Sequence, residues 1–148
     1  MKVKNLLDPS VQQQVIERIN NLSPQSKSLW GKMNVGQMLT HVQRVMAVAY
    51  GTFQLKTNFL LKLIGPFLKS GLYNEKPYKH GLPTHKSYVV TDEKNFANER
   101  EKLIEMIEGF SEQAIVNTQH PVFGSMTKEE WGKSLWKHLD HHLQQFGA

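Results

Sequence analysis

The chain has 148 residues, of which 39% are hydrophobic and 21% are charged, and its formal net charge is +5. This composition is typical of a soluble globular protein, and the length predicts one domain over residues 1–148. Cysteine is absent, which excludes disulfides, cysteine-ligated metal sites and thiol nucleophiles and fits a cytoplasmic location.

The first predicted helix begins at Asp8-Pro9, because aspartate caps helix N-termini and proline suits the first helical position. Apolar residues then recur at three- and four-residue steps as far as Leu22, as they do on the buried face of a helix. Ser23-Pro24 ends this pattern.

The second predicted helix begins at Asn34, which together with Gln37 has the pattern of a capping box. Its apolar face continues as far as Ala49. His41 lies beside that face, one turn before Val45. It is therefore a candidate functional residue next to an otherwise apolar surface.

Residues 51–90 are the least regular part of the chain and are expected to form an insertion between the second and third helices. Within them, residues 58–69 are apolar and cationic with Pro66 inside, which predicts a short or kinked helix. A membrane-surface helix, a cover over a pocket and a dimer face all fit this composition.

The next stretch, residues 73–87, holds two prolines and a glycine and predicts an extended loop. His80 and His85 lie in this loop beside lysines. Such a loop could cover an anionic substrate, although an ordinary exposed loop explains the same residues.

Two further helices are predicted in the C-terminal half. The third follows Thr91-Asp92 and continues to Phe110, and acidic residues near its start complement the helix dipole. The fourth begins at a capping box formed by Thr127 and Glu130. Four amphipathic helices of this length predict an all-α four-helix bundle, with the irregular insertion between its second and third helices.

The last helix carries one stripe of side chains: Trp131, Leu135, His138, His142 and Gln145. The i, i+4 spacing of His138 and His142 places the two imidazoles one above the other. An inward pair of unpartnered imidazoles is costly, and a bound metal removes that cost. With His41 opposite, three histidines could hold one divalent metal and leave a position for water or substrate. Imidazole suits zinc, nickel, copper and iron.

His141 offers an alternative to this ligand set, because it lies three residues from His138 and could chelate with it. The stripe that begins at Trp131 favours His142. His141 is then a pocket residue, a hydrogen-bond donor to a metal-binding histidine, or a partly exposed side chain. Three more polar residues are candidates for lining the pocket or orienting a ligand: Gln37, His120 and Gln145. A helix cap, a rigid turn and a buried amide are the respective structural alternatives.

The pattern resembles the DinB/YfiT-like superfamily of metal-binding four-helix bundles, which has one histidine in its second helix and an HxxxH pair in its last. The matching positions are His41, His138 and His142, and Gln145 matches a glutamine often found after that pair. A closer resemblance, to a branch with no assigned activity, is carried by residues 30–35, 120–124, 130–131 and 137–143. One departure is Leu143, where the superfamily often has arginine.

The resemblance implies a divalent metal in the core, commonly zinc or nickel, and often a homodimer. Some members transfer low-molecular-weight thiols such as bacillithiol or mycothiol, and others are described as metal-dependent hydrolases. We therefore expect a metal-dependent enzyme that acts on a small-molecule substrate, with a thiol as cofactor in the transferase version. A metal-stabilised binding module without catalysis is the alternative. No carboxylate is placed as a general base, which counts against hydrolysis.

Other classes of function are disfavoured by what the sequence lacks. No run of about 18 apolar residues is present, so no membrane span is expected. The lysines are spread along the chain, which indicates a solvated surface and no nucleic-acid-binding face. No phosphate-binding glycine loop, nucleophile elbow or dinucleotide fingerprint is found.

Overall fold

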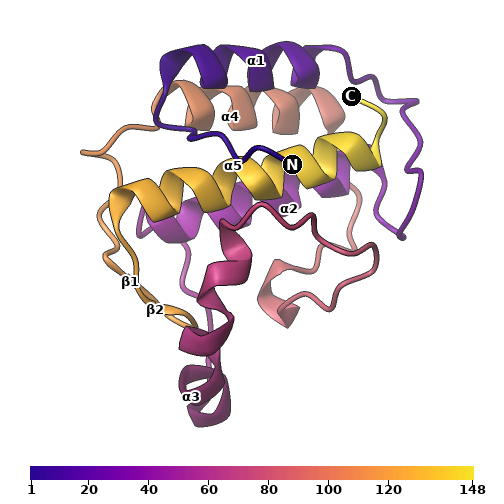
Figure 1. The fold of residues 1–148 in the computed structure, drawn as a ribbon. Helices are drawn as coiled ribbons and strands as arrows, with labels where there is room; N and C mark the ends of the chain where they lie inside the picture. The colour runs from indigo at the N-terminus through magenta and orange to yellow at the C-terminus, as the bar shows by residue number, and fades with distance from the viewer.

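The computed structural model describes Met1–Ala148 and is mostly helical, as predicted (Figure 1). In chain order the elements are α1 (Pro9–Asn20), α2 (Val35–Ala49), α3 (Phe59–Leu68), η1 (Lys69–Leu72), η2 (Lys86–Tyr88), α4 (Phe96–Glu108), β1 (Gln119–His120), β2 (Gly124–Ser125) and α5 (Lys128–Gln145). The 3-10 helices η1 and η2 and the small antiparallel sheet β1-β2 were not predicted from the sequence. None of the helices is both long and apolar enough to cross a membrane.

Helices α1, α2, α4 and α5 pack around one hydrophobic core. In Figure 1, α1 lies above α4 and α5 passes in front of α2, and both α1 and α2 contact α4 and α5. Each of the four helices contributes fully buried side chains, among them Val15, Leu39, Leu103 and Leu135. Burying one such side chain contributes about 2 kcal/mol, so this core fixes how α2 faces α5.

Side-chain caps set where the helices begin. Asp8 caps α1, and the pairs Asn34–Gln37 and Thr127–Glu130 form reciprocal capping boxes at α2 and α5. These three starts were predicted correctly. Because a cap fixes the first residue of a helix, it also fixes which later residues face the core. His41 and the histidines of α5 take their orientation from these boxes.

Helix α4 begins later than predicted. Its cap is Asn95, whose Oδ1 accepts a hydrogen bond from the Asn98 N–H at 3.0 Å, and Asp92 lies outside the helix. Gln37 Nε2 donates to the carbonyl oxygens of Thr91 and Asp92 at 3.1 and 3.3 Å. This contact from α2 holds the two residues outside helical geometry, which moves the helix start downstream.

Residues 51–90, between α2 and α4, contain α3, which projects away from the packed helices (Figure 1). Pro66 lies inside α3, where it removes one backbone hydrogen bond, and the chain tightens into η1 soon after it. Gly65 faces the turn between β1 and β2, and a Cβ there would lie 1.9 Å from the Val122 carbonyl oxygen. Only glycine allows α3 to approach that turn so closely.

Candidate metal centre

The side chains of His41, on α2, and of His138 and His142, on α5, converge on one point. One nitrogen from each ring lies within 4.8 Å of the others, and His41 Nε2 is 3.1 Å from His138 Nε2. Zinc–imidazole bonds of 2.0–2.1 Å place the nitrogens of a tetrahedral site about 3.3 Å apart. The His41–His138 pair matches this spacing, and the three rings lie close enough together that they could hold one cation.

The proton on His41 is placed by its partners. Nδ1 of His41 lies 3.0 Å from the Tyr88 carbonyl oxygen, which can only accept, so Nδ1 carries the proton and Nε2 presents a lone pair. Arg44, one turn after His41, donates to the carbonyls of Ser87 and Val89 at 3.3 and 2.8 Å. Arg44 thus aligns the segment whose carbonyl orients the imidazole.

The proton on His142 is placed in the same way. Its Nδ1 lies 2.8 Å from Gln145 Oε1, and Gln145 Nε2 donates to the Trp30 carbonyl at 2.6 Å. The bond to Trp30 fixes the orientation of the Gln145 side-chain amide, because only its NH2 group can donate to a carbonyl. The amide oxygen therefore faces His142, and Nδ1 of His142 is the donor. Gly31 has φ +81, and a Cβ there would lie 2.6 Å from Gln145 Nε2. Glycine is therefore needed beside this amide.

The three imidazoles are held neutral. Burial lowers the pKa of His41 below its ordinary value of 6.5. Burial, followed by the neighbouring His142 and His41, lowers the pKa of His138 well below that value. Burial, followed by His41, lowers the pKa of His142 to about 3. Neutral imidazole is the form that binds metals. Since His41 Nε2 carries no proton, its contact with His138 requires either a proton on His138 Nε2 or a cation between them.

A second group of rings, which we call the aromatic wall, lies beside the three histidines: Trp30, Tyr78, His80 and His141. The Trp30 and His80 rings stack with centroids 3.7 Å apart. The His141 ring lies 5.6 Å from Trp30 and 5.1 Å from His142. His141 is half-buried and outside the converging group, so the structure brings His142, and not His141, to His41.

Two other candidates lie away from the three histidines. Gln37 uses its amide for the α2 capping box and for the 91–92 carbonyls. His120 packs against Trp131, with ring centroids 5.4 Å apart, and its Nδ1 accepts from the N–H groups of Val122 and Phe123. The geometry of both residues matches their structural alternatives, a helix cap and a rigid turn.

Some residues that shape the site were not found from the sequence. Tyr88 and Trp30 act through backbone carbonyls, which leave no pattern in a sequence. Arg44 could have been found from the sequence, because it lies one helical turn after His41 and therefore near the same face of the helix. Asp140, between the two histidines of α5, is buried and pairs with Arg18 of α1 at 2.7 Å. It therefore joins α5 to α1.

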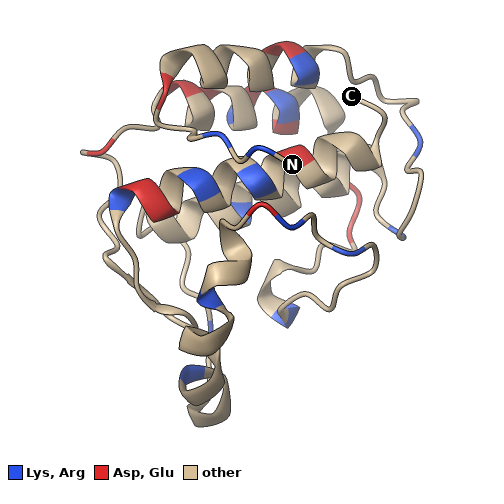
Figure 2. Cartoon of the chain, in the orientation of Figure 1, with Lys and Arg blue, Asp and Glu red and all other residues tan.

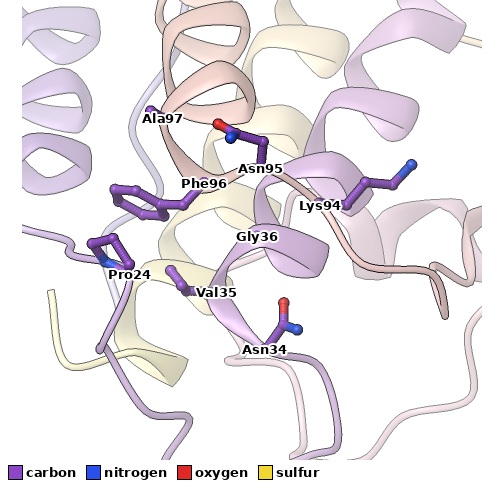
Figure 3. A pocket seen from close by; sticks show the side chains of 8 residues that line it. All are labelled: Pro24, Asn34, Val35, Gly36, Lys94, Asn95, Phe96 and Ala97. Atoms are coloured by element: carbon purple, nitrogen blue, oxygen red, sulfur yellow. The ribbon is translucent and has the colours of Figure 1, made fainter.

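A hollow of about 460 Å³ lies where the N-terminal ends of α2 and α4 meet (Figure 3). Its lining consists of Pro24, Asn34, Val35, Gly36, Lys94, Asn95, Phe96 and Ala97. Asn34 and Asn95 cap the two helices, and Lys94 pairs with Asp92 at 2.6 Å. None of the three converging histidines lines this hollow, so we do not assign it to the candidate metal centre.

The Tyr88 hydroxyl is the one buried side-chain polar atom without a hydrogen-bond partner. Tyr88→Phe is therefore expected to leave the free energy of unfolding unchanged or to raise it by about 1 kcal/mol, because an unsatisfied buried hydroxyl is unfavourable. Urea unfolding measures the change. The matched control is Tyr78→Phe, which removes a bond to the Leu72 carbonyl and should cost about 1 kcal/mol. A larger loss for Tyr88→Phe would show that its hydroxyl has a partner.

Together these features define a mostly helical protein with a largely buried cluster of three histidines that could hold one metal ion. The chain belongs to the family described as "Protein of unknown function (DUF1569)", whose model matches residues 1–148. Searches of curated proteins and of solved structures found no match.

Proposed function

We propose that this protein holds one divalent cation, zinc or nickel, on His41, His138 and His142 and uses it to act on a small molecule. The observation that carries the proposal is the pair of hydrogen bonds that fix the protons of His41 and His142 on Nδ1. Tyr88 and Gln145 hold Nδ1 of His41 and His142, which leaves Nε2 of each ring free to bind a metal. Metal-binding histidines are oriented by such hydrogen bonds on the second ring nitrogen.

The arrangement leaves room for chemistry. Three protein ligands are typical of a catalytic zinc site, in which the fourth position is exchangeable. A divalent cation there would act as a Lewis acid and lower the pKa of a water molecule or thiol at that position. The residue His138 has intermediate exposure, whereas His41 and His142 are buried, so His138 is the least enclosed of the three. The aromatic wall would line the approach to that position.

The resemblance to thiol transferases and to hydrolases suggests two reactions. Asp140, the acidic residue between His138 and His142, is occupied by Arg18 and cannot serve as a general base. We therefore favour transfer of a low-molecular-weight thiol over hydrolysis. The alternative is a binding module in which the cation only stabilises the fold. Turnover of a substrate distinguishes an enzyme from such a module.

We also propose that the packed helices form a DinB/YfiT-like four-helix bundle and one domain over residues 1–148. Two features support this: α1, α2, α4 and α5 enclose one core, and the histidines follow the superfamily's order. His41 lies on the second of these helices, and His138 and His142 lie on the last. Residues 51–90 are then an insertion between α2 and α4.

Metal content tests the proposed site. Wild-type protein and His141→Ala, purified without an affinity tag, are expected to hold about one equivalent of zinc or nickel per chain, and His138→Ala none. Elemental analysis and titration of the added ion provide the measurement. The proposal fails if wild type takes up neither ion, or if His138→Ala retains a full equivalent.

Activity distinguishes an enzyme from a binding module. Thiol-conjugation and hydrolysis reactions are assayed with zinc- or nickel-loaded wild type and with His142→Ala. An enzyme at this site loses its turnover in the variant. Equal turnover in both proteins would place the chemistry elsewhere. Metal binding without turnover of any substrate would favour the binding module.

Gln145→Leu is expected to weaken metal binding roughly ten- to a hundredfold, because loss of a group that orients a ligand histidine typically has this effect. The matched control is Gln144→Leu on the neighbouring, exposed position, which should leave the affinity within twofold of wild type. A competition titration with a zinc chelator measures both. Unchanged affinity in Gln145→Leu would mean that the amide does not orient His142.

A further inference from the structure

Helix α3 exposes six large apolar side chains. The exposed fraction is 80% for Phe59 and 84% for Phe67, and between 44% and 60% for Leu60, Leu63, Ile64 and Leu68. At 100° per residue these six positions cover a continuous arc of roughly 180° around the helix. We call this surface the α3 arc. Gly65 lies outside the arc and is buried.

The α3 arc is large for a surface that faces only water. A fully accessible aromatic side chain presents roughly 150–250 Å², so six residues at these exposures leave on the order of 800 Å² of apolar surface. The largest apolar patch on a typical monomer is about 300–600 Å², and larger patches mark interaction sites. The α3 arc is therefore expected to be covered by a binding partner.

The arc cannot be buried by turning α3 inward, because the helix is fixed to the body. Gly65 packs against the Val122 carbonyl. Lys69 pairs with Glu130 of α5 at 2.8 Å. Lys137 of α5 donates to the Gly71 carbonyl of η1 at 2.8 Å. The Gly65 contact holds the side of α3 opposite the arc, and the other two contacts hold η1, which continues directly from α3. The arc is therefore left pointing outward.

The charge around α3 shows what kind of surface fits it. Residues 51–90 hold six lysines and one glutamate, a net charge of +5, which equals the net charge of the whole chain. The remaining residues carry twelve basic and twelve acidic groups and are neutral. In Figure 2, most acidic positions lie on the packed helices, and α3 carries only basic ones. The lysines are evenly spread, but the acids that would balance them are missing here.

This distribution disfavours a second copy of the chain as the occupant. Two copies meeting through α3 would bring segments of +5 together, and like charges across an interface are repulsive. An anionic phospholipid surface offers the opposite charge together with an apolar interior. Each lysine near such a surface strengthens the binding of the protein about fivefold.

We propose that α3 docks on an anionic phospholipid membrane, with the α3 arc in the boundary between headgroups and acyl chains. A ten-residue helix is about 15 Å long and would lie in the plane of the interface, as amphipathic surface helices do. Phe59 and Phe67 provide the deepest apolar contacts. Lys56 and Lys62, both exposed, contact lipid phosphates. The neutral remainder of the chain stays in water.

Co-sedimentation with vesicles tests this proposal on the full chain. Phosphatidylcholine vesicles with about 30% phosphatidylserine are compared with pure phosphatidylcholine vesicles. Wild type is expected to sediment with the anionic vesicles only. The double variant Phe59→Ser/Phe67→Ser should lower the partition coefficient at least a hundredfold, and Lys62→Gln about fivefold. High salt should weaken the binding of wild type.

The matched control is Val116→Ser, which changes an apolar residue that is 65% exposed but lies outside α3. It should bind like wild type, and circular dichroism checks that every variant is folded. The proposal is overturned if wild type stays in the supernatant, or if it binds both kinds of vesicle equally. It is also overturned if vesicles capture nothing and sedimentation velocity finds a dimer that Phe59→Ser/Phe67→Ser dissociates, because a second copy then covers the arc.

Discussion

Acidification from pH 7 to pH 4 is expected to destabilise the protein by several kcal/mol, because buried imidazoles that are neutral in the folded state become charged on unfolding. Burial lowers the pKa of His120 to about 4 and that of His142 to about 3. Between these values and the unfolded value near 6.5, the unfolded chain binds more protons. The contribution of these histidines to the free energy of unfolding is therefore complete above pH 6.5 and is lost as the pH decreases. His120 alone accounts for a loss on the order of 3 kcal/mol.

Urea unfolding across this pH range measures the effect on metal-free protein. His120→Gln should flatten the pH dependence by about one proton. The matched control is His80→Gln, which changes an exposed ring and keeps every buried imidazole, so the loss of stability at low pH should remain. Bound zinc should add a further pH-dependent contribution, since protons compete with the ion for the same nitrogens. A free energy of unfolding that stays constant from pH 7 to pH 4 would contradict the burial of neutral histidines.

Lys137→Met is expected to lower the free energy of unfolding by roughly 3 kcal/mol, because it removes two charge-assisted hydrogen bonds that a buried ammonium donates. Lys137 is 1% exposed, and its Nζ donates to the carbonyls of Gly71 and Asn74 at 2.8 and 2.9 Å. The same ammonium lies 4.4 Å from the Tyr78 ring centroid, a favourable cation–π contact. The substitution should free residues 71–80, which carry Tyr78 and His80 of the aromatic wall.

Urea unfolding gives the energy, and hydrogen exchange at the amides of residues 71–80 reports the local release. Lys133→Met is the matched control, since it lies one turn earlier on α5 and pairs only with Glu129 at the surface. Its effect should stay within about 0.5 kcal/mol. A similar small effect for Lys137→Met, with unchanged exchange, would mean that the ammonium does not hold this segment.

The starts of three helices could be predicted because their caps are local. Asn34 and Gln37 are three residues apart, and the bonds between them depend on nothing else in the chain. The start of α4 could not be predicted in this way. It is displaced by Gln37, which lies more than fifty positions before the Thr91 carbonyl that it binds. A local rule fails where a distant side chain competes for the same backbone.

The same distinction applies to the candidate metal centre. The spacing of His138 and His142 on one helix shows that they share a face, because helix geometry alone fixes this. The position of His41 opposite them follows from the packing of α2 on α5, and the sequence supports it only through resemblance. The partners of the rings, the Tyr88 carbonyl and the amide that Trp30 orients, depend on loops whose paths no periodicity describes.

Lys137 and His138 are consecutive residues of α5, yet one holds η1 and the other reaches the shared point of the three imidazoles. A ligand that shifts η1 changes the contacts of Lys137. Because His138 lies on the same helical turn, its position changes as well. Binding at α3 and binding at the histidines would then be thermodynamically linked. Such linkage is reciprocal, so each ligand must change the affinity for the other by the same factor.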